Sequence, residues 1–559
     1  LVNIPRWPAL VILLGALVGL VILDRRDPDV ELSTLSIEGV AAMPVAAGDG
    51  ALGSTWYCAG GTAADDGFAD HVVMISNPSD DTVTGTLTAY PTDVDAELVV
   101  ESQRPVTLPL DVPPRSQQLV RLGDVVTAAW AAALLEFGSA EVIVDHRISG
   151  PAGTDSAACS SFASDSWFFP AGSTSKDARE VLVVFNPFPD DAVVDVTFAT
   201  DEGGRAPQRF DGLPVPAGSA IPLDITDVVA RWNQLSATVR TRTGRVVTDR
   251  IVSYDGTEGL TGLTLSAGAP QPALTWIFPA GHGEVGVTES YVILNPHPDR
   301  SAEVDLEVRL DSPELNGAIE PFELTVPPAQ RIVVVVNPTE VHPVSSNATV
   351  DTSGRIPADV GHSVTVRSFN GLPVVVEQVL TASDAAPPSD GTEGETDGAE
   401  VAPPTGGTEG DGDETAENAG ETDAQIVTVQ RGGVTSTLGA PVGATQLVVA
   451  GSAPGDTVVE LAIVNPSLST IARVSVSVVV DGVAVPVDRF TDIEIGSLRR
   501  LEVVGLAEVV GDEPFMIVID SSTAVIAQRT LRPAGASGVD SQIATPVGGT
   551  LSTVDFFGG

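Results

Sequence analysis

The triplet Asp145-His146-Arg147 is the arrangement in this chain most open to a catalytic interpretation, because an adjacent carboxylate and imidazole can act as a general acid–base pair. It ends a Val-rich segment, and three other Val-rich segments end in a similar pair. These pairs are Asp249-Arg250, Glu377-Gln378 and Gln528-Arg529. Since acids, amides, imidazole and guanidinium all occur here, we interpret the position as the end of a recurring strand and predict no catalytic residue.

The remaining groups that could support chemistry are sparse. The six histidines are His71, His146, His282, His297, His342 and His362. None has a metal-ligand spacing with its neighbours, so we expect surface or turn positions, no metal and no cofactor. The serines lack the patterns of an activated nucleophile, G-x-S-x-G and S-x-x-K. The sequence therefore favours a protein that is not an enzyme.

Cys58 and Cys159 are the only cysteines. An even number in an exported protein predicts a disulfide, with two free thiols as the alternative. The bond would close a loop of about 100 residues, which the chain-entropy model values at about 4.7 kcal/mol.

Trp56, Trp167 and Trp276 could stack on sugar rings, which would indicate carbohydrate binding. Each stands at the same place in a repeated pattern, beside aromatic or apolar residues. We therefore expect burial at the junction between repeats, whereas carbohydrate binding would require exposed indole rings.

Four copies of one pattern organise the chain. Each copy has an apolar run that ends in Asn-Pro, and the first three asparagines are 109 residues apart. These asparagines are Asn77, Asn186, Asn295 and Asn465. In copies two to four a glycine lies 14 residues before the asparagine. The tryptophans precede this region in the first three copies, and Gln446 takes their place in the fourth.

The spacing of turns and alternating segments predicts the fold class. Residues 84–90 and 194–198 alternate polar and apolar side chains, as half-buried strands do. Asn-Pro and the later Val-Pro sites mark corners between strands. Units of about 110 residues with this turn spacing predict an all-β protein of four tandem immunoglobulin-like β-sandwiches, with barrels as the alternative.

One Ala-rich segment departs from this pattern. Residues 124–137 begin with Asp124, a good N-cap residue, and predict a short helix. Asp227, Glu340 and Glu508 stand at similar points of the other copies, so a helical turn between two strands is expected in each.

Residues 7–23 form a run of 17 residues without charge, the lower limit for crossing a bilayer as a helix. Arg6 precedes the run, which weakly favours a cytoplasmic N-terminus. No small-x-small cleavage site directly follows it, so we predict an uncleaved signal-anchor within residues 1–29, with cleavage near residues 40–42 as the alternative. The body would then lie on the extracytoplasmic side.

Residues 383–424 contain 13 acidic residues and no basic one. Such a segment cannot bury enough apolar surface to fold, so we predict a disordered linker, with calcium binding as the alternative. The predicted organisation is an anchor at 1–29, repeats at 45–160, 161–268 and 269–382, the linker, and a fourth repeat at 425–559. The net charge of −47 argues against nucleic acid as a partner.

The membrane segment, the Trp-Tyr-Cys opening at residues 56–58, the strands ending in Asn-Pro and the closing PVVVEQ resemble an uncharacterised family of actinobacterial envelope-anchored proteins, defined by a domain of unknown function. The resemblance covers about residues 40 to 380. It implies a location and a fold, and no functional residues.

These observations predict a non-enzymatic envelope protein that serves as a scaffold or binding module. Its partner would be another protein or a glycan of the cell envelope, and the N-terminal helix would hold it in the membrane. The alternatives are an accessory subunit or enzyme of envelope glycan metabolism, and a carbohydrate-binding adhesin.

Overall fold

The computed structural model describes residues 39–47, 51–94, 100–281, 287–311, 319–336, 349–351, 356–357, 360–382, 433–451, 457–480, 482–506, 509, 513–533, 538–548 and 550–553. The predicted membrane anchor at residues 7–23 and the predicted linker at 383–424 lie outside this set. Among the described residues, no helix combines the length and the apolar character needed to cross a membrane.

The described chain is all-β, and its strands fall into four successive units. In each of the first three units, two sheets enclose a hydrophobic core. Alternation of side chains produces these layers, as in β21 (Ala302–Leu310), where every second residue is buried. Strand β2 (Asp70–Asn77) is buried along most of its length instead, because the neighbouring units cover its second face.

The first unit contains β1 (Ser54–Cys58), β2, β3 (Val83–Val94), β4 (Val100–Ser102), β5 (Val106–Val112), β6 (Ser116–Arg121), β7 (Trp130–Phe137), β8 (Ile143–Gly150) and β9 (Gly153–Ala158). The second contains β10 (Ser166–Phe169), β11 (Ala178–Asn186), β12 (Ala192–Thr200), β13 (Gly203–Arg205), β14 (Leu213–Val215), β15 (Ser219–Asp224), β16 (Ser236–Thr243), β17 (Val247–Asp255) and β18 (Thr261–Ala267). The third contains β19 (Thr275–Gly281), β20 (Val287–Asn295), β21, β22 (Phe322–Val326), β23 (Gln330–Val336), β24 (Thr349–Asp351), β25 (His362–Ser368), β26 (Val375–Ala382) and β27 (Gly433–Leu438).

The first three units share one strand order. One sheet runs β1-β7-β3, β10-β16-β12 or β19-β25-β21, and the other runs β6-β2-β8-β9, β15-β11-β17-β18 or β23-β20-β26-β27. All of these pairs are antiparallel, and β24 adds a parallel edge to β23. The repeats read from the sequence therefore correspond to a repeated topology.

The fourth unit joins its two sheets through one long strand. It contains β28 (Val442–Gly451), β29 (Thr457–Val464), β30 (Ala472–Val480), β31 (Val483–Pro486), β32 (Ile493–Ile495), β33 (Arg500–Val503), β34 (Phe515–Pro533), β35 (Asp540–Ile543), β36 (Thr545–Pro546) and β37 (Leu551–Thr553). The first part of β34 pairs with β28 and β30, and its second part pairs with β29 and β35. One strand thus replaces the two that a short loop separates in each other unit.

The helix predicted at residues 124–137 is wrong. A 3₁₀ turn at Leu122–Asp124 is followed by β7, which lies between β1 and β3. Pairing on both edges overrides the helical propensity of the alanines, whose small side chains fit this crowded position. The expected turn itself is present in the first, second and fourth units, since Val126 N–H donates to Leu122 O, Val229 N–H to Ile225 O and Val509 N–H to Leu506 O. Glu340 of the third unit lies outside the described residues.

Each Asn-Pro asparagine is fully buried and fastens its turn to the Val-Pro corner. In the second unit Nδ2 of Asn186 donates to the carbonyl oxygens of Asp190, Val215 and Pro216 at 2.8, 3.0 and 3.3 Å. Its Oδ1 accepts the N–H of Phe188 at 3.1 Å. The equivalent four bonds occur at Asn77, Asn295 and Asn465. The two sequence landmarks recur together because one side chain joins them.

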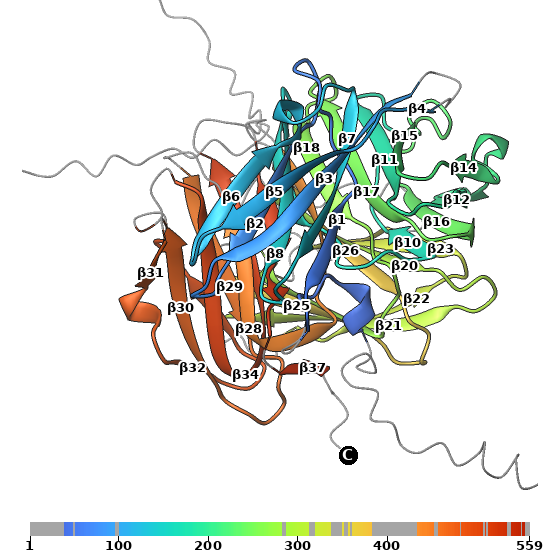
Figure 1. Ribbon diagram of the computed structural model, residues 1–559. Helices are drawn as coiled ribbons and strands as arrows, with labels where there is room; N and C mark the ends of the chain where they lie inside the picture. The colour runs from blue at the N-terminus through green and yellow to red at the C-terminus, as the bar shows by residue number, and fades with distance from the viewer. Residues whose placement is uncertain are drawn as a thin grey trace, which may run out of the picture.

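The four units close into a ring (Figure 1). Strand β15 contacts β3 and β7, β23 contacts β12, and β19 contacts β29 and β34. The circle is completed where β30 and β34 of the fourth unit contact β6 of the first, which places orange strands beside blue ones in Figure 1. We call these contacts seam 1–2, seam 2–3, seam 3–4 and seam 4–1.

Strands β9, β18, β27 and β35 face one another around the centre of the ring, each in contact with the next. Polar side chains connect them. Asp155 on β9 accepts the N–H of Leu265 at 2.8 Å and the hydroxyl of Thr435 at 3.1 Å. On the opposite side of β9, the hydroxyl of Ser156 donates to the Asp540 carboxylate at 2.8 Å.

Strand β27 completes the third unit, although the sequence boundary at residue 425 assigns it to the fourth. It pairs with β26, and Ala382 and Gly433 are Cα partners. Residues 383–432 therefore stand between two strands of one hairpin, where the first unit has only residues 151–152. The long acidic insertion hid this relation, because β27 lies far along the chain from its own repeat.

The segment of residues 39–47 ties the start of the described chain to the far side of the ring. Met43 packs against Ile277 and Val442, which belong to the third and fourth units. The N–H of Ala46 donates to Pro546 O at 3.0 Å. The beginning and the end of the folded chain therefore meet.

Replacing Asn186 by alanine should lower the free energy of unfolding by about 3 kcal/mol, because three carbonyl oxygens and one N–H lose their partner. Urea unfolding followed by tryptophan fluorescence measures the change. Asn233→Ala, at an exposed position, is the control and should shift stability by less than about 0.5 kcal/mol. Equal small effects of both substitutions would contradict the fastening role of Asn186.

A protease site inserted between residues 383 and 424 tests the assignment of β27. After cleavage the C-terminal piece should co-elute with the N-terminal piece in native size-exclusion chromatography, because the β26–β27 pairing and two seams hold it. The two pieces should separate only in denaturant. Elution of residues 425–559 as a separate folded species would instead identify an autonomous fourth repeat.

Candidate functional site

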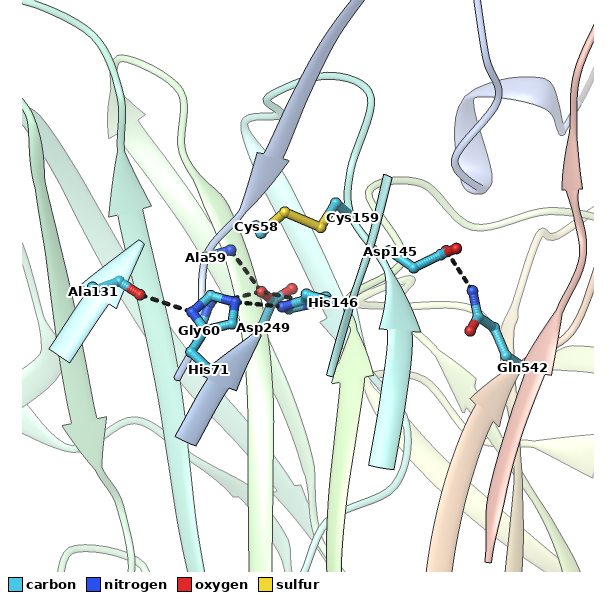
Figure 2. Close-up of a disulfide and its surroundings, with 10 residues drawn as sticks. All are labelled: Cys58, Ala59, Gly60, His71, Ala131, Asp145, His146, Cys159, Asp249 and Gln542. Carbon is cyan, nitrogen blue, oxygen red and sulfur yellow. Dashed lines mark hydrogen bonds and ion pairs between the residues drawn. A yellow bond between two sulfur atoms is a disulfide. The ribbon is translucent and has the colours of Figure 1, made fainter. Parts of the chain in front are cut away.

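The adjacent residues Asp145 and His146 belong to different seams (Figure 2). Successive side chains of a strand point to opposite faces. The Asp145 carboxylate accepts Nε2 of Gln542, in the fourth unit, at 2.6 Å. His146 faces the other way, with Nδ1 3.0 Å from His71 Nε2 and Nε2 3.7 Å from Asp249 Oδ2. The two residues form no catalytic dyad.

The position of Asp145 recurs as an acceptor for a backbone N–H from the preceding unit around the ring. The donors belong to the alanines that follow the tryptophan landmark. Ala59 N donates to Asp249 at 2.8 Å, Ala171 N to Glu377 at 2.9 Å and Ala280 N to Gln528 at 2.9 Å. At seam 4–1 the Ala450 amide acts on Asp145 and lowers its pKa. The alanine after the tryptophan pattern in one unit and the acidic or amide residue of the Val-rich segment in the next unit therefore form one contact.

The residue that follows the acceptor donates to the carbonyl of the corresponding alanine in its own unit. Arg250 donates to Ala171 O, Gln378 to Ala280 O at 2.8 Å, and Arg529 to Ala450 O. In the first unit the Gly60 backbone interacts with His146. In the second, third and fourth units the N–H and the C=O of this alanine are thereby both paired, as burial requires.

The four seams use different chemistry at this common position. Seam 2–3 contains a buried ion pair, with Arg250 Nη2 2.5 Å from Glu377 Oε1. At this position seam 3–4 is uncharged, since Gln528 Nε2 donates to Gln378 Oε1 at 2.8 Å, although Arg500 pairs with Asp311 elsewhere in the same seam. At seam 4–1 Arg529 bonds Asp540 within its own unit at 2.6 Å and Ser156 of the first unit at 2.9 Å.

Burial raises the pKa of Asp249 to about 7, and the N–H groups of Ala59 and Gly60 oppose this shift. Burial also raises the pKa of Asp145 to about 7, against the opposing bond from Gln542 and the charge of Arg529. Both carboxyls therefore titrate near neutral pH, far above an exposed aspartate.

The histidines beside Asp249 remain neutral. Burial lowers the pKa of His71 to about 4, and burial lowers that of His146 well below its usual value. His71 Nδ1 lies 2.9 Å from Ala131 O, which fixes its proton there, so Nε2 accepts from His146 Nδ1. The remaining nitrogen of His146 then presents a lone pair to Asp249, which favours a protonated Asp249.

A second buried polar position stands six residues before each Asn-Pro asparagine in the first three units. Its residues are His71, Glu180 and Glu289, and all are fully buried. Glu180 packs on Gly172, where an added Cβ would lie 2.7 Å from a carboxylate oxygen. Sequence reasoning missed this position, although its fixed distance from Asn-Pro is visible in the sequence.

Cys58 and Cys159 form the predicted disulfide, with Cα atoms 4.8 Å apart (Figure 2). The bond joins β1 to the residue after β9. At the corresponding points of the second and third units, Phe169 and Phe278 cover Gly268 and Gly439 so closely that a Cβ would lie 2.6 and 2.7 Å from the ring. In the first unit Cys58 therefore stands where the other two units have the phenylalanine, and Cys159 stands where they have the glycine.

The tryptophans are buried as expected, with at most 1% of each surface exposed. They lie in the cores of their own units rather than between repeats, and the indoles of Trp167 and Trp276 donate to the carbonyls of Val246 and Val374. Sugar stacking on these rings is therefore excluded. In the fourth unit Leu447 rather than Gln446 fills the buried place, because this copy lacks the proline found in copies two and three.

The expectation of surface or turn histidines is wrong for three of them. His71, His146 and His362 are fully buried, and His362 Nε2 lies 3.1 Å from Glu289 Oε2. His297 stands at a turn, and His282 and His342 lie outside the described residues. Histidine, cysteine and acidic side chains form no group suited to a metal ion within the described part of the chain.

A cavity of about 520 Å³ lies in seam 2–3. Its floor is the face of β20 and β26 that points away from the core of the third unit, with Ser290, Val292 and Val379. Its walls come from β17, β18 and the loop after Ala171. At the rim Lys176, the only lysine of the chain, lies 2.8 Å from Glu258.

This geometry defines an all-β protein whose units close into a ring through buried polar side chains. Residues 139–263 match a family of unknown function (DUF5719). The match runs from the end of the first unit to β18, and so includes the pairs Asp145-His146 and Asp249-Arg250. No curated protein matches the chain.

Among solved structures, the chain is similar to one entitled "Crystal Structure of Thermotoga maritima 1070". The identity is 16% and the TM-score 0.18, over 19% of this chain and 95% of that one. A likeness of this size carries no argument about fold or function.

Asp249→Asn should stabilise the protein increasingly as the pH rises from about 4 to 7. The raised pKa means that the folded state of the natural protein holds a proton that the unfolded state releases, so its stability falls over this range. Asparagine can accept the N–H groups of Ala59 and Gly60 without carrying a charge, and its NH₂ group can donate to His146. Gln528 plays the same double part at seam 3–4, where its NH₂ group donates to Gln378.

The advantage of the variant should grow by up to about 1.4 kcal/mol per pH unit, measured by urea unfolding. Glu141→Gln, at an exposed position, is the control and should show no such trend. A constant difference between Asp249→Asn and the natural protein from pH 4 to 8 would contradict the raised pKa.

Proposed function

We propose that this chain is a non-enzymatic, extracytoplasmic protein of the cell envelope that acts as a rigid scaffold or binding module. Closure of the four units into one ring is the observation that carries the proposal. The buried acids, histidines and arginines are engaged in its seams, and this use is structural. A closed ring presents its outer loops in fixed relative positions, as a platform for partners requires.

The finer assignment of the fold is part of this proposal. Two antiparallel sheets around one core, with corners at Asn-Pro and Val-Pro, support an immunoglobulin-like unit. The proposed units follow the predicted limits 45–160, 161–268 and 269–382, with β27 added to the third and the fourth starting near β28.

Three features support the envelope location. A disulfide persists in oxidising compartments. The charge-free run at residues 7–23 is long enough for an anchor, and the resemblance to actinobacterial envelope-anchored proteins agrees with it. The net charge of −47 suits a soluble body held away from an anionic membrane.

Location is tested by the double substitution Leu14→Arg and Leu17→Arg in the apolar run. The natural chain should sediment with membranes and have no reactive thiol after denaturation without reductant, whereas the double variant should stay soluble, with Cys58 and Cys159 labelled by maleimide once denatured, because both are buried in the fold. Leu14→Val with Leu17→Val is the control and should behave as the natural chain. Thiol labelling of the natural chain in cells would overturn the proposed location.

The scaffold role is tested by carbodiimide coupling in intact envelopes. The chain has 75 acidic residues and one lysine, so coupling should link it to amines of a partner rather than to itself. We expect discrete higher-mass adducts that contain a second envelope component. Absence of adducts across a range of carbodiimide concentrations would argue against a protein partner.

A further inference from the structure

The cavity in seam 2–3 results from the length of one loop. In seam 1–2 the loop between β1 and β2 carries Phe68, which packs against the core of the second unit and under Arg179 at 4.4 Å. The corresponding loop between β10 and β11 is shorter and carries Ser173, Ser175 and Lys176. No aromatic ring of this loop fills the space, and about 520 Å³ remains open. This volume lies in the range of small-molecule sites.

The lining combines aliphatic surface with hydroxyl groups. Val292, Val335 and Val379 supply the apolar floor, and Thr288, Ser290 and Thr381 alternate with them on the same sheet face. Tyr254 adds an aromatic ring with a hydroxyl on the opposite wall. Such a surface contacts both the C–H and the O–H groups of a ligand.

The basic groups around the cavity are compensated, and the acidic Asp177 accepts the Ser175 hydroxyl at 2.6 Å. Arg250 is paired with Glu377, and Lys176 with Glu258. Burial raises the pKa of Glu180, which lies beneath Gly172, to about 8, so this carboxyl is neutral at pH 7. A net anionic ligand would have no free positive charge among these groups.

Two buried polar atoms near the cavity lack a hydrogen-bond partner. They are Nε of Arg250, which lines the cavity, and Oε1 of Glu180 behind it. Both side chains are at most 1% exposed. Because both atoms are covered by protein, the groups open to a ligand are those of the lining side chains.

We propose that the cavity in seam 2–3 binds a neutral carbohydrate of one or two sugar rings. This inference rests on the proposed binding role and names its ligand class. The valines and Tyr254 would contact the faces of the sugar, while Thr288, Ser290 and Thr381 would bond its hydroxyls. The site is independent of the buried tryptophans.

Saturation-transfer NMR tests the proposal with the purified full-length chain in a sugar-free detergent. The probes are glucose, galactose, mannose, arabinose, N-acetylglucosamine and disaccharides built from them, each at up to about 10 mM, a concentration that detects weak binding. We expect at least one sugar to show saturation transfer.

Three variants locate the binding site. Ser290→Phe fills the cavity and should abolish the signal. Thr288→Val with Thr381→Val keeps the volume but removes two hydroxyls, and should weaken binding about tenfold, since each hydrogen bond contributes about 0.5–1.5 kcal/mol. Ser477→Phe, a half-buried serine in the centre of β30, is the control and should bind as the natural chain does.

Two outcomes would overturn the inference. One is the absence of saturation transfer from every sugar, and the other is binding that survives Ser290→Phe in a folded protein. In either case the envelope location and the carbodiimide adducts would still support the proposed function. If the location and carbodiimide tests failed while sugar binding remained, the proposed scaffold role would be wrong and the proposed sugar site would stand.

Discussion

The closed arrangement of the four units depends on one kind of contact, in which a backbone amide of one unit pairs with a side chain of the next. The N–H of an alanine is buried where two units meet, and it must find an acceptor there because water does not reach it. A side chain of the next unit supplies that acceptor at three seams, with distances between 2.8 and 2.9 Å. Since each unit both gives an amide and receives one, the contacts close on themselves, and the first unit is held by the fourth as well as by the second.

The strands and turns within each unit could be predicted from the sequence, whereas the contacts that close the units into a ring could not. Repeat spacing predicted the all-β units, and Asn-Pro was correctly interpreted as a turn. The pairs such as Asp145-His146 were wrongly interpreted as strand ends, since they lie inside β8, β17, β26 and β34. Their partners were invisible because Asp145 and Gln542 are 397 positions apart. The helix at residues 124–137 failed because pairing on two strand edges outweighs the propensity of alanine. The repeat pattern gave no sign of the cavity, because the cavity arises where the short loop between β10 and β11 carries no aromatic ring to fill the seam.

The varied chemistry of the seams selects the correct neighbours. Removing one partner from a buried ion pair costs about 3–5 kcal/mol, because the other charge stays buried and uncompensated. A second unit placed against the fourth would leave Arg250 facing Gln528 instead of Glu377. Sheets of the same topology could otherwise exchange places, and the side chains at these positions make such exchanges unfavourable.

The meeting of the two ends of the folded chain determines how the molecule bears force. Tension that enters through the residues before Gly39 reaches Met43 and Ala46, which are held by the third and fourth units and by Pro546. Force applied at Gly39 would therefore act on contacts with the third and fourth units before it reaches β1. A linear string of domains would extend one domain at a time under tension. In this closed arrangement the contacts of residues 39–47 with the third and fourth units must break before the units can be pulled apart.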